Sequence, residues 1–138
     1  MAPTIIKSDF LESGETIAQM INGEDGSGIV TNTGKIYQWG VIAGMGGTGK
    51  NQNHPDGRSP ILTNVTGAQD WIHVSQGNEH ICGITSDNKL YCWGTNTHGE
   101  LGDGTNTDSY IPVAVDVSGI GSAQTFSKVF VGLDHSCA

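Results

Sequence analysis

The chain has 138 residues, which is enough for one domain with a hydrophobic core. Its formal charge is -8, and its six Lys and Arg residues are scattered, which argues against a direct nucleic-acid partner because such a partner requires a basic face. No apolar run approaches the length of a membrane span, and the N-terminus lacks the apolar core of a cleaved signal peptide. The 21 glycines, about twice the usual ~7% share, are typical of short strands joined by many turns.

Residues 1–16 form an N-terminal extension. It opens with the apolar run Pro3–Ile6 and then becomes polar. Similar runs, Pro60–Thr63 and Pro112–Val115, precede later parts of the chain, so we expect the extension to be the tail strand of a preceding unit. A first repeat unit then occupies residues 17–70.

A glycine-rich segment, Gly44–Lys50, has the glycine and lysine skeleton of a phosphate-binding loop. That chemistry requires a Ser or Thr after the lysine, and a helix whose N-terminus faces the phosphates. Asn51 follows the lysine instead, and the sequence of residues 51–60 cannot begin an amphipathic helix. The glycines also align at an offset of 55 with those of residues 99–104. We therefore assign them to a repeat loop and expect no nucleotide or other cofactor.

The fullest unit is residues 71–125, and its centre predicts a β-hairpin. Two β-rich runs, ICGIT and KLYCWG, flank the short polar stretch Ser86–Asn88. A three-residue hairpin loop needs a residue in the left-handed region at its last position, where Gly and Asn fit best. Asn88 occupies that position.

This loop places Cys82 opposite Cys92 on the two strands. In an antiparallel ladder they form a non-hydrogen-bonded pair, with Cα atoms about 4.5 Å apart, which is close enough for a disulfide. Two free thiols are the alternative. A bridge here would stabilise the hairpin by about 3 kcal/mol in the chain-entropy model. Paired cysteines favour an oxidising, extracellular compartment or a particle surface.

Shifting the sequence against itself reveals copies of this unit. At an offset of 55, Trp71, Val74, Gly77, His80 and Cys82 align with Phe126, Val129, Gly132, His135 and Cys137. At an offset of 54 in the other direction, Asn88 aligns with Gly34, which also accepts left-handed geometry. Cys82 and Cys92 align with Gly28 and Gln38, so both members of the pair are absent together, as expected for a bonded pair.

Residues 126–138 form a half unit. It contains no counterpart of the return strand Lys89–Gly94, and hence no counterpart of Cys92 to face Cys137. Natural proteins seldom leave such a strand edge unpaired. We therefore expect the C-terminal edge to pair with another polypeptide, by self-assembly or with a protein partner, and we name Cys137 as a candidate intersubunit cysteine.

The candidates for catalysis and metal binding are better explained as scaffold. His80 and His135 share one repeat position, which predicts a buried hydrogen bond, and His73 lies seven residues before His80 with no third ligand in range. Neither Ser75 nor Ser136 lies in a nucleophile motif. Residues 103–108 faintly resemble a calcium loop but carry Thr at two ligand places, so we expect a turn. The sequence predicts no catalytic residue and no metal site.

The motifs GNEHICGITSDNKLYCWG, GELGDG and DSYIPVAV resemble the regulator-of-chromosome-condensation repeat family, over most of residues 17–138. The paired cysteines are more similar to its secreted, mostly bacterial branch than to the nuclear one. The resemblance implies an all-β fold of β-propeller type, with blades of four antiparallel strands. The chain holds about two and a half repeats of roughly 55 residues.

The resemblance implies a non-catalytic propeller module that binds another protein at an extracellular or particle surface. The first alternative is a structural subunit of a filament or virion, whose incomplete blades are completed by neighbouring subunits. The second alternative is a secreted propeller that inhibits an enzyme.

Overall fold

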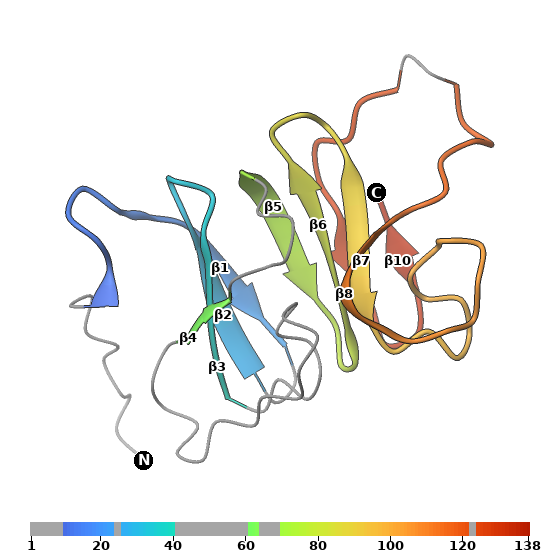
Figure 1. Cartoon of the computed structure of the whole chain (residues 1–138), viewed down its shortest axis with the longest axis horizontal. Coiled ribbons are helices and arrows are strands. Elements are labelled where there is room, and N and C mark those ends of the chain that lie inside the picture. Colours follow the sequence, from blue (N-terminus) through green and yellow to red (C-terminus); the bar gives the residue numbers. More distant parts are fainter. Residues whose placement is uncertain (1–9, 24–25, 41–60, 64–69, 122–123) are drawn as a thin grey trace.

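The structure is a computed structural model, and Figure 1 shows its two four-stranded sheets side by side with a short third sheet beyond them. It describes residues 10–23, 26–40, 61–63, 70–121 and 124–138. The apolar run Pro3–Ile6 and the glycine-rich segment Gly44–Lys50 lie outside the described residues. The described part is all-β, and none of it is a helix long and apolar enough to cross a membrane.

Each four-stranded sheet is an antiparallel meander in chain order. The first contains β1 (Ile17–Asn22), β2 (Gly26–Thr31), β3 (Ile36–Gly40) and β4 (Ile61–Thr63). The second contains β5 (Trp71–Gln76), β6 (His80–Thr85), β7 (Leu90–Gly94) and β8 (Ser109–Ala114). This is the four-stranded blade expected for a propeller.

The third sheet repeats the start of a blade. It pairs β9 (Phe130–Val131) with β10 (Ser136–Cys137), in the register that β5 and β6 use 55 residues earlier. The connecting turn recurs in all three sheets as one backbone hydrogen bond: Gly23 to Gly26 (2.8 Å), Gly77 to His80 (2.9 Å) and Gly132 to His135 (2.8 Å). The half unit therefore has the local geometry of a blade.

The hairpin register predicted from the sequence is confirmed. Ile84 pairs with Leu90, Gly83 with Tyr91 and Cys82 with Cys92. Asn88 has a φ of 62° and its counterpart Gly34 a φ of 75°, so both occupy the left-handed conformation that the three-residue loop requires.

Successive sheets are joined through their first strands. The backbone N–H of Val74 donates to Oε1 of Gln19 (2.9 Å), and Nε2 of Gln19 donates to the Val74 carbonyl (2.6 Å). The next interface repeats this contact, because the N–H of Val129 donates to Nδ1 of His73 (3.3 Å). The role of His73 is therefore to accept a hydrogen bond between blades.

Two apolar clusters fill the interfaces. The first, between the first two sheets, contains Ile21, Val30, Ile36, Trp71, Val74, Ile81 and Trp93, with Tyr91 packed against it. The second, between the second and third sheets, contains Cys82, Ile84, Cys92, Leu101 and Val129. Trp71 and Trp93 are core residues, whereas Trp39 in β3 is only half-buried.

Candidate functional site

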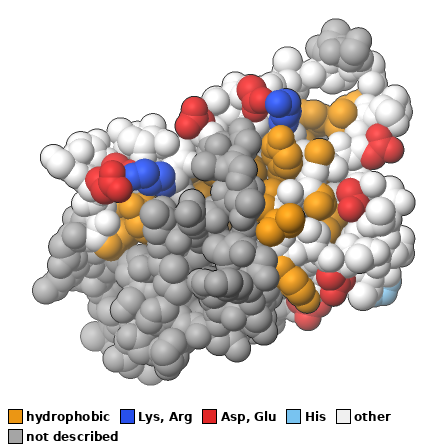
Figure 2. Space-filling view, in the orientation of Figure 1, with side chains coloured by type: hydrophobic (Ala, Val, Ile, Leu, Met, Phe, Trp, Pro, Cys, Tyr) orange, Lys and Arg blue, Asp and Glu red, His pale blue; other side chains and the backbone are white. Residues whose placement is uncertain are grey.

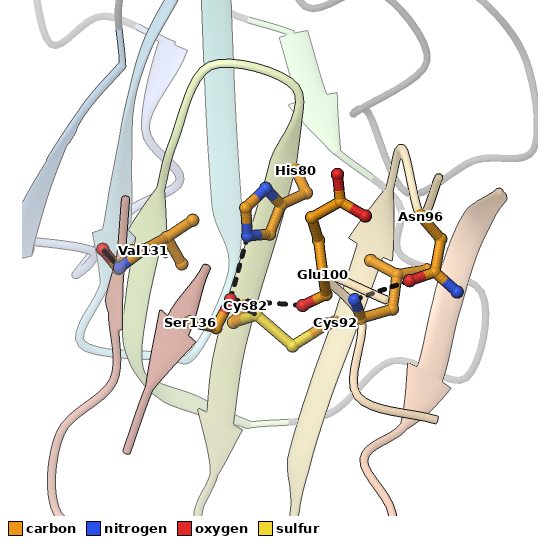
Figure 3. The surroundings of a disulfide bond; sticks show 9 residues. His80, Cys82, Cys92, Asn96, Glu100, Val131 and Ser136 are labelled. Carbon is orange, nitrogen blue, oxygen red and sulfur yellow. Dashed lines mark hydrogen bonds between the residues drawn. A yellow bond between two sulfur atoms is a disulfide. The ribbon is translucent and has the colours of Figure 1, made fainter. Parts of the chain in front are cut away.

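The candidate site lies at the interface between the second and third sheets, where the Cys82–Cys92 disulfide crosses from β6 to β7 (Figure 3). The two Cα atoms are 4.1 Å apart, and both side chains are buried. Such close approach is typical of a non-hydrogen-bonded cross-strand pair. The disulfide presents a rigid apolar surface to the third sheet.

Three polar groups connect the two sheets beside this disulfide. Oγ of Ser136 donates to the carbonyl of Glu100 (3.3 Å) and lies 2.9 Å from Nε2 of His80, as Figure 3 shows. The Ser136 hydroxyl donates its proton to the Glu100 carbonyl, so its oxygen accepts a hydrogen bond from Nε2–H of His80. Burial lowers the pKa of His80, and this outweighs the opposite effect of the nearby carboxylates of Glu100 and Asp134. The imidazole is therefore held neutral.

The expectation of a buried hydrogen bond is confirmed for His80 and wrong for His135, whose side chain is exposed. The difference has a structural cause. The group that covers His80 is Ser136 of the following sheet, and the described residues contain no sheet beyond β10 to cover His135 in the same way.

One group of side chains could present three ligand atoms to a metal ion. His98, Glu100 and Asp134 each place one such atom within 4.8 Å of the others. The Glu100 carboxylate is already used, because the N–H of His98 donates to it (2.8 Å) and Nδ1 of His98 lies 3.3 Å from it. Burial would raise the pKa of Glu100, but hydrogen bonds from backbone N–H groups and from His98 outweigh burial and lower it. The buried Glu100 carboxylate thus serves to shape its own loop.

The loop between β7 and β8 is folded around Asn96, which is completely buried. Its Nδ2 donates to Asp103 (3.2 Å) and to the carbonyls of Thr105 (3.0 Å) and Thr107 (3.1 Å), while its Oδ1 accepts from the N–H of Leu101 (2.9 Å). The segment that faintly resembles a calcium loop is therefore held as a turn by an asparagine side chain. It also fixes Leu101 under the disulfide.

A groove of about 430 Å³ lies between the second sheet and the third. Val117 and Ile120 on its wall are 39% and 47% exposed. Figure 2 shows hydrophobic side chains gathered over the region of β7 and β8. The apolar wall consists of Leu90, Leu101, Val115, Val117, Ile120 and Phe126.

The groove ends at β10. Within the described residues β10 pairs only with β9, so its second edge has no strand beside it. The register of β6 shows which groups face that edge: Cys82 lies in a non-hydrogen-bonded pair with Cys92, whereas Gly83 exchanges hydrogen bonds with Tyr91. The counterpart of Gly83 is Ala138, which follows β10 directly, so a strand continued in this register would turn the backbone N–H of Ala138 to that edge. Cys137 is an exposed free thiol beside it.

Two stacked four-stranded antiparallel sheets, followed by the first two strands of a third, define part of a β-propeller. Comparison with known proteins gives the family. Models of the regulator of chromosome condensation (RCC1) repeat match residues 71–100 and 87–138. The chain belongs to the RCC1 repeat family.

Its relatives include large proteins of several kinds. It is 30% identical over 112 residues to the ultraviolet-B receptor UVR8 of Arabidopsis thaliana, a match that covers 80% of this chain and 25% of that protein. It is 32% identical over 108 residues to the human E3 ubiquitin-protein ligase HERC2, covering 69% of this chain and 2% of that protein. The chain thus spans a quarter or less of the length of these relatives.

Solved structures agree on the fold. Human WBSCR16 matches with a TM-score of 0.65 and 24% identity, over 87% of this chain and 30% of that one. Prp20p of Saccharomyces cerevisiae matches with a TM-score of 0.69 and 19% identity, over 91% of this chain and 31% of that one. The described sheets therefore have the geometry of blades in a larger propeller.

The groove was not predicted from the sequence, and neither was the hydrogen bond between Ser136 and the Glu100 carbonyl. Ser136 carried a usable signal, because it occupies the repeat position of the core residue Ile81. A serine at an apolar repeat position next to a buried histidine indicates a hydrogen bond. No signal was available for the groove, since Val117 and Ile120 lie in a segment without repeat counterparts in the described residues.

Proposed function

We propose that this chain is a non-catalytic, protein-binding module of propeller blades that works at an extracellular or particle surface. Family membership supports a binding role: Prp20p is described with its binding properties to Gsp1p and histones, and Kap60 has been crystallised bound to yeast RCC1 (Prp20). Those partners are properties of those proteins. For this chain the proposal concerns only the class of partner, which is another polypeptide.

The observation that carries the proposal is the apolar groove between the second and third sheets, which ends at β10. A strand edge offers unpaired N–H and C=O groups, and another strand can add to them. Beside this edge the groove offers apolar surface for the side chains of that strand. Main-chain hydrogen bonds would supply affinity, and side-chain pockets would supply specificity.

The buried disulfide supports the proposed location. Disulfides persist in oxidising compartments and are rare in the cytosol. The Cys82–Cys92 bridge belongs to a blade core, which is the expected place for a structural bridge in a secreted or surface protein.

Self-assembly is the second candidate, and the exposed thiol of Cys137 favours it. Cys137 occupies the repeat position of Cys82, so a neighbouring strand in the β6–β7 register would place a residue directly opposite it. A cysteine there would form an intersubunit bridge, the two thiols giving two protons and two electrons to an oxidant such as oxidised glutathione. In this form the chain is a structural subunit of a filament or virion. An enzyme-inhibiting propeller is a special case of the first candidate.

Light scattering on the full chain after size exclusion tests the proposal. We expect a mass above the 14.5 kDa of the monomer, either as a homo-oligomer or in complex with a co-purified protein from the native source. Ala138→Pro removes the N–H at the repeat position of Gly83, which pairs with Tyr91 in the second sheet, and should dissociate the assembly, because proline cannot donate to a strand ladder. Ala138→Ser is the matched control and should leave the mass unchanged. If the parent chain and both variants are monomers of the same mass, the proposal is contradicted.

A further inference from the structure

Three side chains that suit a metal ion converge between the second and third sheets. His98 and Glu100 belong to the loop between β7 and β8, and Asp134 belongs to the turn between β9 and β10. One ligand atom of each residue lies within 4.8 Å of the other two. The group combines an imidazole with two carboxylates, and its members come from two different repeat units.

The first two ligand atoms already have the spacing of a metal site. Nδ1 of His98 lies 3.3 Å from Oε1 of Glu100. Bonds of about 2.0–2.2 Å to a tetrahedrally coordinated zinc ion place two ligand atoms about 3.3–3.6 Å apart. The hydroxyl of Thr97, 3.1 Å from the same nitrogen, belongs to an exposed side chain and can rotate to bind water instead. The loop therefore presents a preformed pair of ligand atoms.

Glu100 is held in place by its own loop. Its side chain is only 4% exposed, and its Oε2 accepts the backbone N–H of His98 at 2.8 Å. An ionised carboxylate has about four lone-pair sites, so the bonds that shape the loop leave a site on Oε1 for a metal ion. Loop shaping and metal binding are therefore compatible at the same carboxylate.

The charges of the group also favour a cation. Glu100 and Asp134 place carboxylate oxygens within 4.8 Å of each other, and like charges at this distance repel. Within the described part of the chain, neither carboxylate forms an ion pair with Lys or Arg. Asp134 is exposed, so a change of rotamer brings its carboxylate closer to an ion held by the other two residues.

We propose that His98, Glu100 and Asp134 bind one divalent first-row metal ion such as Zn²⁺, which joins the second sheet to the third. An imidazole ligand suits Zn²⁺, whereas Ca²⁺ and Mg²⁺ prefer oxygen ligands alone. With the metal on Nδ1, the single proton of the neutral imidazole lies on Nε2. Three protein ligands leave the fourth position to water. This site goes beyond the proposed function and does not depend on it.

The preceding interface supplies a matched control. Glu79 holds the repeat position of Asp134, in the turn between β5 and β6, and it is also exposed. At the offset of 55, Ala43 and Met45 take the places of His98 and Glu100 in the sequence. Neither is an imidazole or a carboxylate, so Glu79 has the acidic charge of Asp134 without the accompanying ligands.

Isothermal titration calorimetry of the full chain with zinc chloride tests the site. All proteins carry Cys137→Ser, because an exposed thiol can bind zinc by itself. We expect one ion per chain, and a Kd at least about tenfold weaker in His98→Gln and in Asp134→Asn, since each removes a ligand. Glu79→Gln should leave the Kd unchanged. The three substituted residues are exposed, so these variants should keep the far-ultraviolet circular dichroism of the parent.

Two further measurements locate the ion. Zinc should raise the Tm of the parent and of Glu79→Gln but not of Asp134→Asn, because a site built from two sheets exists only in the folded chain. In nuclear magnetic resonance spectra, zinc should shift the imidazole nitrogen signals of His98. Those of His135, which is exposed next to Asp134 in the sequence, should stay in place.

Any of four results would overturn the inference. The first is no binding at zinc concentrations up to about 1 mM. The second is binding of equal strength in the parent, His98→Gln and Asp134→Asn. The third is a zinc-induced shift at His135 in place of His98. The fourth is an affinity for calcium equal to that for zinc, which would assign the ion to carboxylate oxygens alone.

Discussion

Nε2 of His80 lies 2.9 Å from Oγ of Ser136, across the interface between the second and third sheets. His73 makes the neighbouring contact, in which its Nδ1 accepts the N–H of Val129. Both contacts use a neutral imidazole between two sheets. The blade interface is therefore expected to respond to pH.

We predict that stability falls as the pH is lowered through the histidine range. Burial lowers the pKa of both His73 and His80, aided at His73 by the charge of Lys128. Below about pH 6.5, the pKa of histidine in the unfolded chain, the two imidazoles bind protons in the unfolded chain but not yet in the folded one. The neutral histidines therefore contribute their full stabilisation above about pH 7. This contribution is lost progressively as the pH falls towards the lowered pKa values of His73 and His80 in the folded protein. Urea unfolding at pH 7.5, 6.5 and 5.5 measures it.

Matched variants assign the pH effect. The double change His73→Gln and His80→Gln should flatten the dependence between these pH values, because it removes both imidazoles from the blade interfaces. A slope that survives the double change would show that other groups are responsible.

The disulfide should stabilise the second blade measurably. Replacing both Cys82 and Cys92 with Ser should lower the free energy of unfolding by about 3 kcal/mol, because the bridge limits the unfolded chain. Peptide mapping without reduction should recover the two cysteines in one linked fragment. Cys137→Ser is the control and should leave stability unchanged. Two free thiols in protein from the native source would contradict the prediction.

Gly77 should tolerate no side chain. A Cβ at this position would collide with the carbonyl oxygen of Gly132 and would lie 2.7 Å from Cγ1 of Val131 in the next sheet. Gly77→Ala is therefore expected to cost about 1–3 kcal/mol through overpacking. Gly119→Ala, with nothing within 4 Å of the added Cβ, should change stability by less than about 0.5 kcal/mol. Equal urea midpoints for the two variants would refute the close approach of the blades.

Asn96 should be essential to the loop that supports the groove. Asn96→Ala leaves the N–H of Leu101 and two carbonyls without their side-chain partner, and should cost about 2 kcal/mol or more. The exposed Asn106 also bonds within this loop, through the carbonyl of Thr97, and Asn106→Ala should cost under about 1 kcal/mol. Thermal unfolding of both variants measures the difference. The idea fails if the buried and the exposed asparagine prove equally costly.

The sequence alone determined the features that depend on nearest neighbours along the chain. Turn chemistry at Asn88 set the hairpin register, and with it the facing of Cys82 and Cys92. The repeat offset aligned Gly77 with Gly132, where the same turn hydrogen bond recurs, and the family resemblance implied four strands in each blade. These features follow from local geometry, because a positive φ and an alternating ladder leave few arrangements open.

Only the tertiary structure decided which residues are covered by a neighbouring blade. His80 and His135 share a repeat position, as do Ile36 and Leu90, yet in each pair one residue is buried and the other is not. Burial of these residues depends on the following sheet, which the sequence of a single unit does not contain. The groove beside β10 is lined by residues of two different sheets. Its existence therefore depends on how the sheets pack, which the sequence of one unit does not contain.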